Sequence, residues 1–362
     1  MTHVSSKQPV VRAPALSSSQ RFRRLLLLCL ALLLLVLGLA PLFGSSDISV
    51  LRSLLDASDP AHPWHHSPAA RVLIYGRIPR VVAAALAGAG LSVAGVAFQA
   101  LLRNPLADPF TLGVSSGSSL GAVLAIRLGW ESLQLFGHPL GEFALSGCAL
   151  IGAIAVVALV YVVGERGSAG PSTLLLSGVT LALLAGALIT AVLYTADFAE
   201  TYRIVRWQMG DLDVMRYDLV LRMAVPVLLA IVLLWPHARD LNALSAGSDA
   251  AAGLGVDVGR ATRVVYLAAS LAVAAVVSVA GPIGFVGLLV PHTLRALVGA
   301  DHRLLLPASA LCGASFLVVC DTLAQVLFRP AVLPVGVLTA SIGAPFFVAL
   351  LLSRNLRRRL WG

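Results

Sequence analysis

The chain has 362 residues, of which 58% are hydrophobic and only 12% are charged, and its mean hydropathy is +0.91. Because soluble globular domains carry about 25% charged residues, this composition excludes a soluble protein and predicts an all-α polytopic membrane protein. The net charge is +9, but the basic residues form no groove-reading motif and lie beside hydrophobic runs. We therefore interpret them as charges that set membrane topology, and we expect no nucleic-acid partner.

The lysine content excludes a P-loop ATPase, and the cysteine positions argue against a disulfide-bonded protein. The only lysine is Lys7, in a polar stretch with no glycine-rich context. A P-loop places its lysine on the nucleotide phosphates, so this chain is not itself a P-loop ATPase. The four cysteines lie inside apolar runs, and helical spacing puts Cys312 and Cys320 roughly 12 Å apart. They predict no disulfide framework.

The N-terminal part contains a tail and a first span. Residues 1–20 are rich in Ser and Pro and are expected to be a disordered cytoplasmic tail. The apolar run 25–43 is too long for the hydrophobic part of a signal peptide, and many spans follow it, so we predict a retained first helix. The predicted spans lie near residues 25–43, 78–102, 110–128, 143–163, 172–194, 219–236, 262–280, 284–298, 304–327 and 334–353.

These ten transmembrane helices are an even number, so both termini are expected on one side. Assigning that side to the cytoplasm leaves ten arginines outside and the other 16 basic residues inside, in agreement with the positive-inside rule. We therefore predict a multi-pass protein of the cell inner (plasma) membrane. Residues 21–354 form its single transmembrane domain, and residues 355–362 are a basic cytoplasmic tail.

Two connections differ from the rest in composition. The outer segment 194–218 is too polar to span and is expected to hold a short helix at the membrane surface. The inner connection 237–263 is the longest on its side. Its small residues, together with Gly247, Gly253 and Gly255, predict two short helices joined by a turn.

Two spans have irregular composition. Spans 110–128 and 284–298 are short or rich in glycine. Irregular helices are tolerated at membrane depth only where they are buried in protein or line a water-filled cavity. A translocation pathway is therefore expected.

The rest of the chain is organised around the stretch 77–120. It begins with Arg77 and Arg80, and no residue from 81 to 102 is charged. Small residues leave little bulk on this helix, which close helix–helix approach in lipid requires. Pro105 and Pro109 then break the helix. The small residues are Gly88, Ala89, Gly90, Ser92, Ala94, Gly95 and Ala97.

Several motifs in order resemble one family. They are Arg77-Ile-Pro-Arg80, Gly88-Ala-Gly, Gln99, Asn104-Pro-Leu-Ala-Asp-Pro109, Leu112-Gly-Val-Ser, Gly281-Pro-Ile-Gly-Phe-Val-Gly-Leu-Leu-Val-Pro-His292, Leu333-Pro-Val-Gly336 and Gly343-Ala-Pro-Phe346. Each motif alone is weak, but their order and spacing from about Arg77 to Arg354 resemble the permease subunit of FecCD-type ABC importers for iron–siderophores, haem and cobalamin.

The resemblance implies a transport subunit rather than an enzyme. Its implied partners are a second copy of the chain, two ATP-binding cassette subunits that hold ATP and Mg²⁺, and a periplasmic or lipid-anchored substrate-binding protein. This chain would itself hold no cofactor. The implied cargo is a bulky metal chelate, for which a ferric siderophore is the leading expectation and cobalamin or haem the alternatives.

The resemblance also implies a coupling loop within residues 237–263 that docks in a groove of the ATPase subunit. For an arbitrary membrane protein a solvated linker would be the simpler interpretation. A compact loop that is held by another protein can transmit rigid-body motion to the helices attached to it. The expected coupling residues are Leu244, Ser245, Gly247, Gly253, Leu254, Gly255 and Val256.

On the outer face, Arg77 and Arg80 resemble the family's arginines that dock the binding protein. The alternative is that both side chains extend to lipid headgroups. Where many members carry a further basic residue this chain has Gln325, so Arg329 is expected to replace it.

The gate and pathway positions are also carried over by resemblance. Leu106, Pro171 and Ser172 match the cytoplasmic gate, although a proline turn and a helix start explain them equally well. The expected pathway and motif residues are Gln99, Asn104, Pro105, Asp108, Ser115, Ser116, Pro291 and His292, with Ser118 and Ser119 beside them. Small residues in lipid more often serve packing.

Other polar residues have simpler explanations. His292 is expected to be a hydrogen-bonded structural group. Asp321 would cost about 2.5–3.5 kcal/mol at a bilayer centre, so a capping or pairing role is predicted. His62, His65 and His66 match no strong zinc pattern, and no metal site is predicted.

Two other function classes need groups that the sequence does not offer. An ion-coupled secondary transporter needs ionisable groups near mid-membrane, and the spans offer almost none. An intramembrane hydrolase needs a catalytic constellation, and no Ser-His-Asp, H-E-x-x-H or paired intramembrane carboxylates are present.

Overall fold

The computed structural model describes residues 18–45, 68–135, 138–166, 171–212 and 216–352. The helices are α1 (Ser18–Leu39), η1 (Ala40–Leu42), α3 (Pro68–Arg71), the π-helix η3 (Val72–Arg77), α4 (Ile78–Leu101), η4 (Pro109–Leu112), α5 (Val114–Arg127), η5 (Trp130–Ser132), α6 (Gly141–Arg166), α7 (Pro171–Thr195), α8 (Phe198–Gln208), α9 (Tyr217–Leu234), α10 (Ala238–Ala246), α11 (Ser248–Gly253), α12 (Val258–Ala280), α13 (Val286–Val298), α14 (His302–Val326) and α15 (Val335–Leu352). A two-residue antiparallel hairpin, β1 (Gln134–Leu135) with β2 (His138–Pro139), joins η5 to α6.

The expected apolar spans are present as helices. Within the described residues, seven helices are long and apolar enough to cross a membrane, and the helices Val286–Val298 and Val335–Leu350 are shorter but also apolar. Together with the 14-residue α5 they match the ten predicted spans. The all-α polytopic fold is therefore confirmed.

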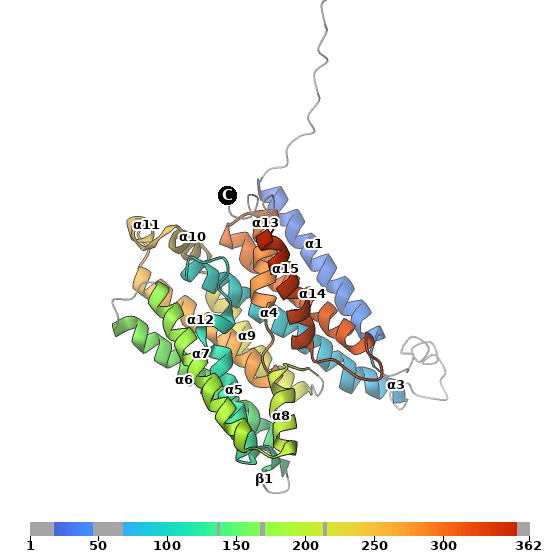
Figure 1. Ribbon diagram of the computed structural model, residues 1–362. Helices are drawn as coiled ribbons and strands as arrows, with labels where there is room; N and C mark the ends of the chain where they lie inside the picture. The colour runs from blue at the N-terminus through green and yellow to red at the C-terminus, as the bar shows by residue number, and fades with distance from the viewer. Residues whose placement is uncertain (1–17, 46–67, 136–137, 167–170, 213–215, 353–362) are drawn as a thin grey trace, which may run out of the picture.

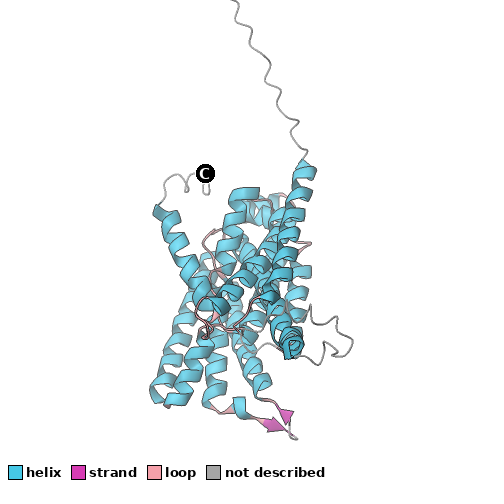
Figure 2. Ribbon diagram, turned by 90° about the vertical axis from the view of Figure 1, so that its right-hand side faces the viewer, coloured by secondary structure: helices cyan, strands magenta, loops and turns pink. Residues whose placement is uncertain are grey.

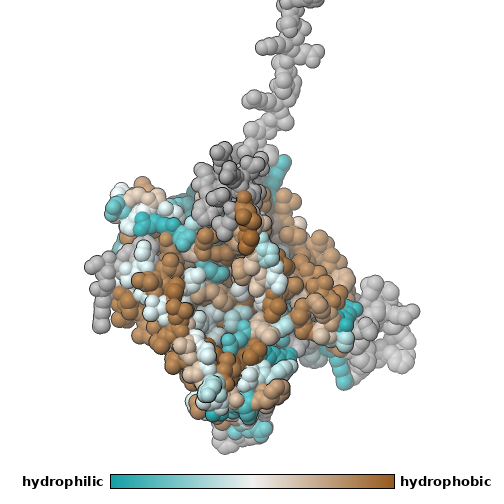
Figure 3. Space-filling model, viewed as in Figure 1, coloured by the Kyte–Doolittle hydropathy of each residue, from teal (hydrophilic) through white to brown (hydrophobic). Residues whose placement is uncertain are grey.

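The two ends of the helix bundle differ. The start of α1, the end of α15 and the short helices α10 and α11 lie at one end, while α8 and the β1–β2 hairpin lie at the other (Figures 1 and 2). We call them the elbow end and the hairpin end. Hydrophilic residues gather at both ends, and hydrophobic surface lies between them (Figure 3). The location of both chain ends in the cytoplasm stays a prediction. The tails 1–17 and 353–362 and His62, His65 and His66 lie outside the described residues.

The core is built around α4. In the most apolar 18-residue stretch of the span that contains α4, 78% of the residues are buried. The corresponding shares are 72% for α12 and 67% for α14, but only 11% for α1 and 17% for α7. The small residues make this burial possible, because a Cβ at Gly88 would clash with the carbonyl oxygen of Gly313 on α14, and one at Gly95 with that of Gly287 on α13. The helix backbones therefore touch directly, as the small-residue pattern predicts.

The polar outer segment forms α8, a short helix as predicted. Asp197 and Glu200 make a reciprocal capping box at its start, with the Asp197 carboxylate 2.7 Å from the Glu200 N–H. Ile204 is fully buried beneath the helix, whereas its neighbours on the other side are exposed. This one-sided burial holds α8 against the hairpin end of the bundle.

Candidate functional site

The hairpin end contains a buried ion pair between α4 and α14. The Arg80 guanidinium donates to both carboxylate oxygens of Asp321, with N–O distances of 2.8 to 3.1 Å. Only 6% of Arg80 and 1% of Asp321 are exposed. The Gln325 amide donates to the same carboxylate at 2.8 Å, one helical turn along α14. The pairing role predicted for Asp321 is confirmed.

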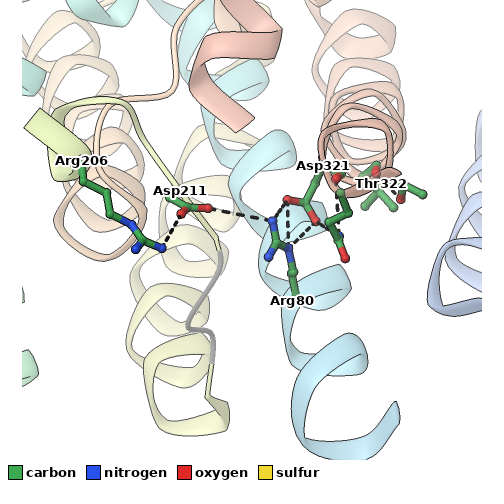
Figure 4. Close-up of polar contacts among 7 residues, drawn as sticks. Arg80, Arg206, Asp211, Asp321 and Thr322 are labelled. Carbon is green, nitrogen blue, oxygen red and sulfur yellow. Dashed lines mark hydrogen bonds and ion pairs between the residues drawn. The ribbon is translucent and has the colours of Figure 1, made fainter. Parts of the chain in front are cut away.

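The pair continues into the outer segment (Figure 4). Asp211 lies 3.9 Å from the Arg80 guanidinium and 3.7 Å from that of Arg206, which is half exposed on α8. The Asp211 N–H donates to the carbonyl of Ala280 at the end of α12, at 2.8 Å. A row of alternating charges therefore runs from the interior of α14 to the outer surface.

The three arginines expected to dock a binding protein lie in different environments. Arg77 is 7% exposed, and its guanidinium donates to the carbonyls of Pro41 and Leu42 at 3.0 and 3.2 Å. Arg329 is exposed and donates to the nearby carbonyl of Gly44. Arg80 is buried, which differs from the exposed side chain expected, because Asp321 offers it a bidentate partner inside the protein. Of the three, Arg329 presents the most accessible charge, and the docking roles remain predictions.

Gln99 and Asn104 hold the end of α4. The Gln99 amide donates to the carbonyl of Gly287 on α13 at 3.4 Å. The Asn104 carbonyl oxygen accepts the Leu106 N–H at 3.0 Å and so closes the turn that contains Pro105. Gln99 therefore ties α4 to α13, and Asn104 shapes the turn that follows α4.

Asp108 joins two irregular connections. Its carboxylate accepts the Phe110 N–H at 3.0 Å and also a hydrogen bond from the backbone of Phe285. Phe285 precedes α13 in the left-handed region, with φ of 68°, which is uncommon for a bulky residue. Desolvation raises the pKa of Asp108 from 3.8 to about 6, although both hydrogen bonds act in the opposite direction.

An aromatic cluster surrounds the Phe285 turn. A Cβ at Gly343 on α15 would meet the Phe285 ring, so the glycine makes room for it. Phe347 lies 6.5 Å from the Phe285 ring and 5.7 Å from the His292 ring, between centroids. Leu106, a predicted gate residue, packs against this cluster. His292 and Pro291 are buried, and His292 is thus part of an apolar packing site.

The other gate and pathway residues do not gather at one place. Ser172 is exposed in the first turn of α7, which begins at Pro171. Ser115, Ser118 and Ser119 are buried. Ser116 is half-buried. The buried serines lie on α5, which packs closely on α6 through glycines, so these side chains serve helix packing in the isolated chain.

The elbow consists of α10 and α11, joined at Gly247 with φ of 121°. Two short helices and a turn were predicted here, and this is confirmed. Leu244 is buried, and Val256 packs against the small core that contains it. Leu254 is 74% exposed. The elbow therefore has a core of its own and displays a large apolar side chain.

A groove of about 530 Å³ lies between α10 and the segment that leads from the end of α11 into the first turn of α12. Arg239 and Arg260 line it together with Asp240 and Asp257. Ser245, Gly253 and Gly255 are exposed on the same elbow. This polar groove beside the apolar Leu254 has the mixed character of a protein-binding surface.

Sequence reasoning missed two polar contacts. Asp211 and Asn242 both lie in polar segments, and nothing in the local sequence distinguishes them from solvated residues. Asn242 on α10 contacts Asp301 and His302 beside the start of α14. Within the described residues no group of three His, Cys, Asp or Glu side chains is placed to hold a metal ion.

Comparison with known proteins gives the family. Residues 27–353 match the model of the FecCD transport family. The cobalamin import system permease protein BtuC of Halobacterium salinarum is 44% identical over 281 residues, which cover 78% of this chain and 73% of that protein. The hemin transport system permease protein HmuU of Yersinia pestis is 36% identical over 342 residues, which cover 92% of this chain and 97% of that protein.

Solved structures agree with the sequence comparison. One, an inward-facing conformation of an ABC transporter of the metal-chelate type, has a TM-score of 0.79 and 32% sequence identity, and the match covers 91% of this chain and 99% of that one. The predicted family, fold class, membrane location and lack of enzymatic activity are confirmed. The chain therefore belongs to the FecCD transport family, as a permease subunit of an ABC importer for metal chelates whose ATP is hydrolysed by a separate subunit.

Proposed function

We propose that two copies of this chain enclose a translocation path, with two ATPase subunits at the elbow end and a substrate-binding protein at the hairpin end. The elbow end then faces the cytoplasm. The exposed Leu254 and the adjacent groove support this assignment, because together they have the mixed apolar and polar character that protein-binding surfaces have. The chain holds no cofactor of its own, and ATP and Mg²⁺ bind to the ATPase subunits.

The second copy is supported by the shape of the isolated chain. Helix α7 is strongly apolar, but only 17% of its most apolar window is buried. Leu176, Leu183 and Leu184 are exposed on it. One such helix face can meet lipid, but a path through the membrane needs protein on every side because lipid-exposed irregular backbone is not tolerated. A second copy would cover part of the exposed apolar surface and enclose the path from the other side.

For the cargo, we propose a tetrapyrrole chelate, either cobalamin or haem. The observation that carries this choice is that relatives named for cobalamin and hemin transport share 44% and 36% identity with this chain. A ferric siderophore, the leading expectation from the sequence, is the second candidate and is supported by the metal-chelate transporter of the same fold.

Equilibrium binding to the cognate binding protein tests the cargo most directly. Cyanocobalamin, haemin and a ferric hydroxamate siderophore would be titrated in parallel, followed by ATP-dependent uptake into proteoliposomes that contain the whole complex. Tight binding and uptake of either tetrapyrrole supports the proposal. Uptake of the siderophore alone would replace it with the second candidate, and uptake of none of the three would overturn both.

A further inference from the structure

The start of α14 is capped by a side chain from the elbow. Asp301 accepts the Arg303 N–H at 3.0 Å, as a helix-capping residue does. Asn242 on α10 supplies a second cap, because its carbonyl oxygen accepts the His302 N–H at 2.9 Å. The same oxygen lies 2.7 Å from Nδ1 of the His302 ring.

The nitrogen of the Asn242 amide also makes a hydrogen bond. Its N–H donates to Oδ1 of Asp301 at 2.9 Å. Hydrogen bonds from Arg303 lower the pKa of Asp301 to about 2, so this acceptor is ionised at neutral pH. The contacts with His302 and Asp301 therefore fix one orientation of the Asn242 amide. Its oxygen faces the His302 N–H, and its nitrogen faces the Asp301 carboxylate. Leu241 on α10 is fully buried, but apolar burial is not directional.

The first turn of α14 depends on these caps. Pro307 lies inside the helix, and a proline has no N–H to donate to the carbonyl four residues earlier. The turn that Asn242 holds is therefore less stabilised by the helix's own hydrogen bonds.

Beyond that turn, α14 is firmly attached to α4 at two places. Its backbone at Gly313 touches α4 at Gly88, where a Cβ on either residue would clash. Farther along, Asp321 forms the buried ion pair with Arg80. His302 and Asp321 are 19 residues apart, or about 28 Å along a helix. One helix thus links the elbow to the charge row at the hairpin end.

We propose that Asn242 is the positioning residue through which movement of α10 and α11 reaches α14 and, along α14, the Arg80–Asp321 pair. This inference rests on the proposed function, in which the ATPase subunits move the elbow. The mechanical link is then the Asn242 amide, which hydrogen-bonds with both its oxygen and its nitrogen at the start of α14. Apolar packing around Leu241 is not the link.

The test compares Asn242→Ala, Asn242→Asp and Asn242→Asp with Asp301→Asn in the full complex. Asn242→Ala removes the side-chain hydrogen bonds to His302 and Asp301, and Asn242→Asp puts a second carboxylate beside Asp301. The double variant exchanges the amide and the carboxylate, so it keeps an acceptor for the His302 N–H and a hydrogen bond between residues 242 and 301. It loses only some of the bonds that the two Asp301 oxygens accept from Arg303, because an amide has one oxygen. The readout is the amount of chelate transported per ATP hydrolysed in proteoliposomes, which a purely structural residue would leave unchanged in the complexes that assemble.

We expect each single variant to lower this ratio at least about fivefold, the effect of losing one or two hydrogen bonds, and the double variant to recover most of it. An unchanged ratio in Asn242→Ala, or a double variant as poor as Asn242→Asp, would overturn the inference. Hydrogen exchange of the purified chain is a second measurement. Exchange at His302 to Leu305 should be faster in Asn242→Ala, and unchanged exchange would also overturn it. If the wild-type complex transports no chelate, the proposed function fails, and the exchange result still decides whether Asn242 holds α14.

Discussion

Arg80 and Asp321 are 241 residues apart in the chain and form a bidentate ion pair inside the protein. Arg80 lies in the first turn of α4 and Asp321 near the end of α14. Because Asp211 and Arg206 extend the row outward, this pair connects the core helices to the surface on which a binding protein is proposed to dock.

Loss of one partner of this pair should destabilise the fold. Asp321→Ala removes the bidentate partner of the buried Arg80 guanidinium, and breaking a buried pair costs about 3–5 kcal/mol. Replacing both residues, with Arg80→Met and Asp321→Leu, should cost less because no charge stays buried. Thermal unfolding of the purified protein in detergent measures both. Equal midpoints for wild type and Asp321→Ala would contradict a structural role for the pair.

The exposed Leu254 should matter for assembly but not for the fold of the chain. Leu254→Asp puts a charge on a surface that is proposed to contact the ATPase subunit, and we expect at least about a tenfold weaker complex, as for a central apolar interface residue. Leu244→Ala is the matched control, because Leu244 is buried in the elbow and its truncation should lower the chain's own stability. Co-purification and thermal unfolding separate the two effects. Full assembly of the Leu254→Asp variant would place the ATPase elsewhere.

Arg329 offers a docking test that leaves the buried pair intact. It is the exposed member of the three predicted docking arginines, so Arg329→Glu should slow association with the binding protein about tenfold at low salt. The difference should shrink as salt is raised, because exposed charges are screened beyond about 10 Å at 0.1 M salt. Stopped-flow association at several salt concentrations measures it. An association rate independent of both the charge and the salt would contradict docking at this residue.

The raised pKa of Asp108 predicts that the stability of the fold depends on pH. Its pKa of about 6 lies above the ordinary 3.8, so the folded protein binds a proton more tightly there than the unfolded chain does. Ionisation of Asp108 therefore costs stability above pH 6, and the cost disappears as the pH falls from 6 to 4. Asp108→Asn keeps an oxygen acceptor for the Phe110 N–H and should unfold at a higher temperature than wild type at pH 8. The two should converge near pH 4, and a gap that is constant with pH would contradict this account.

Much of the fold could be predicted because it depends on local composition. Apolar runs defined the spans, small residues on α4 marked the helix that others approach closely, and Gly247 with its neighbours predicted the two helices of the elbow. Each of these features is set by residues close together in the sequence. The resemblance to a transporter family, carried by motif order, is confirmed by the family match over residues 27–353.

The polar contacts between distant segments could not be predicted in the same way. Arg80 could face the outer surface or the interior equally well by sequence, and only the position of Asp321 on a neighbouring helix decides between them. The sequence around Asn242 predicts a solvated side chain. Its contacts appear only in the fold, where α10 lies beside the start of α14. The direction of a long polar side chain depends on packing that local sequence does not encode.

Reconstituted transport tests the central claim most directly, namely that this chain is a conduit moved by partner subunits. Proteoliposomes would contain the chain alone, the chain with its ATPase subunits, or the full complex with the loaded binding protein, each with and without ATP. Accumulation of chelate against its gradient is predicted only for the full complex with ATP. Accumulation by the chain alone, driven by a proton or sodium gradient, would contradict the account.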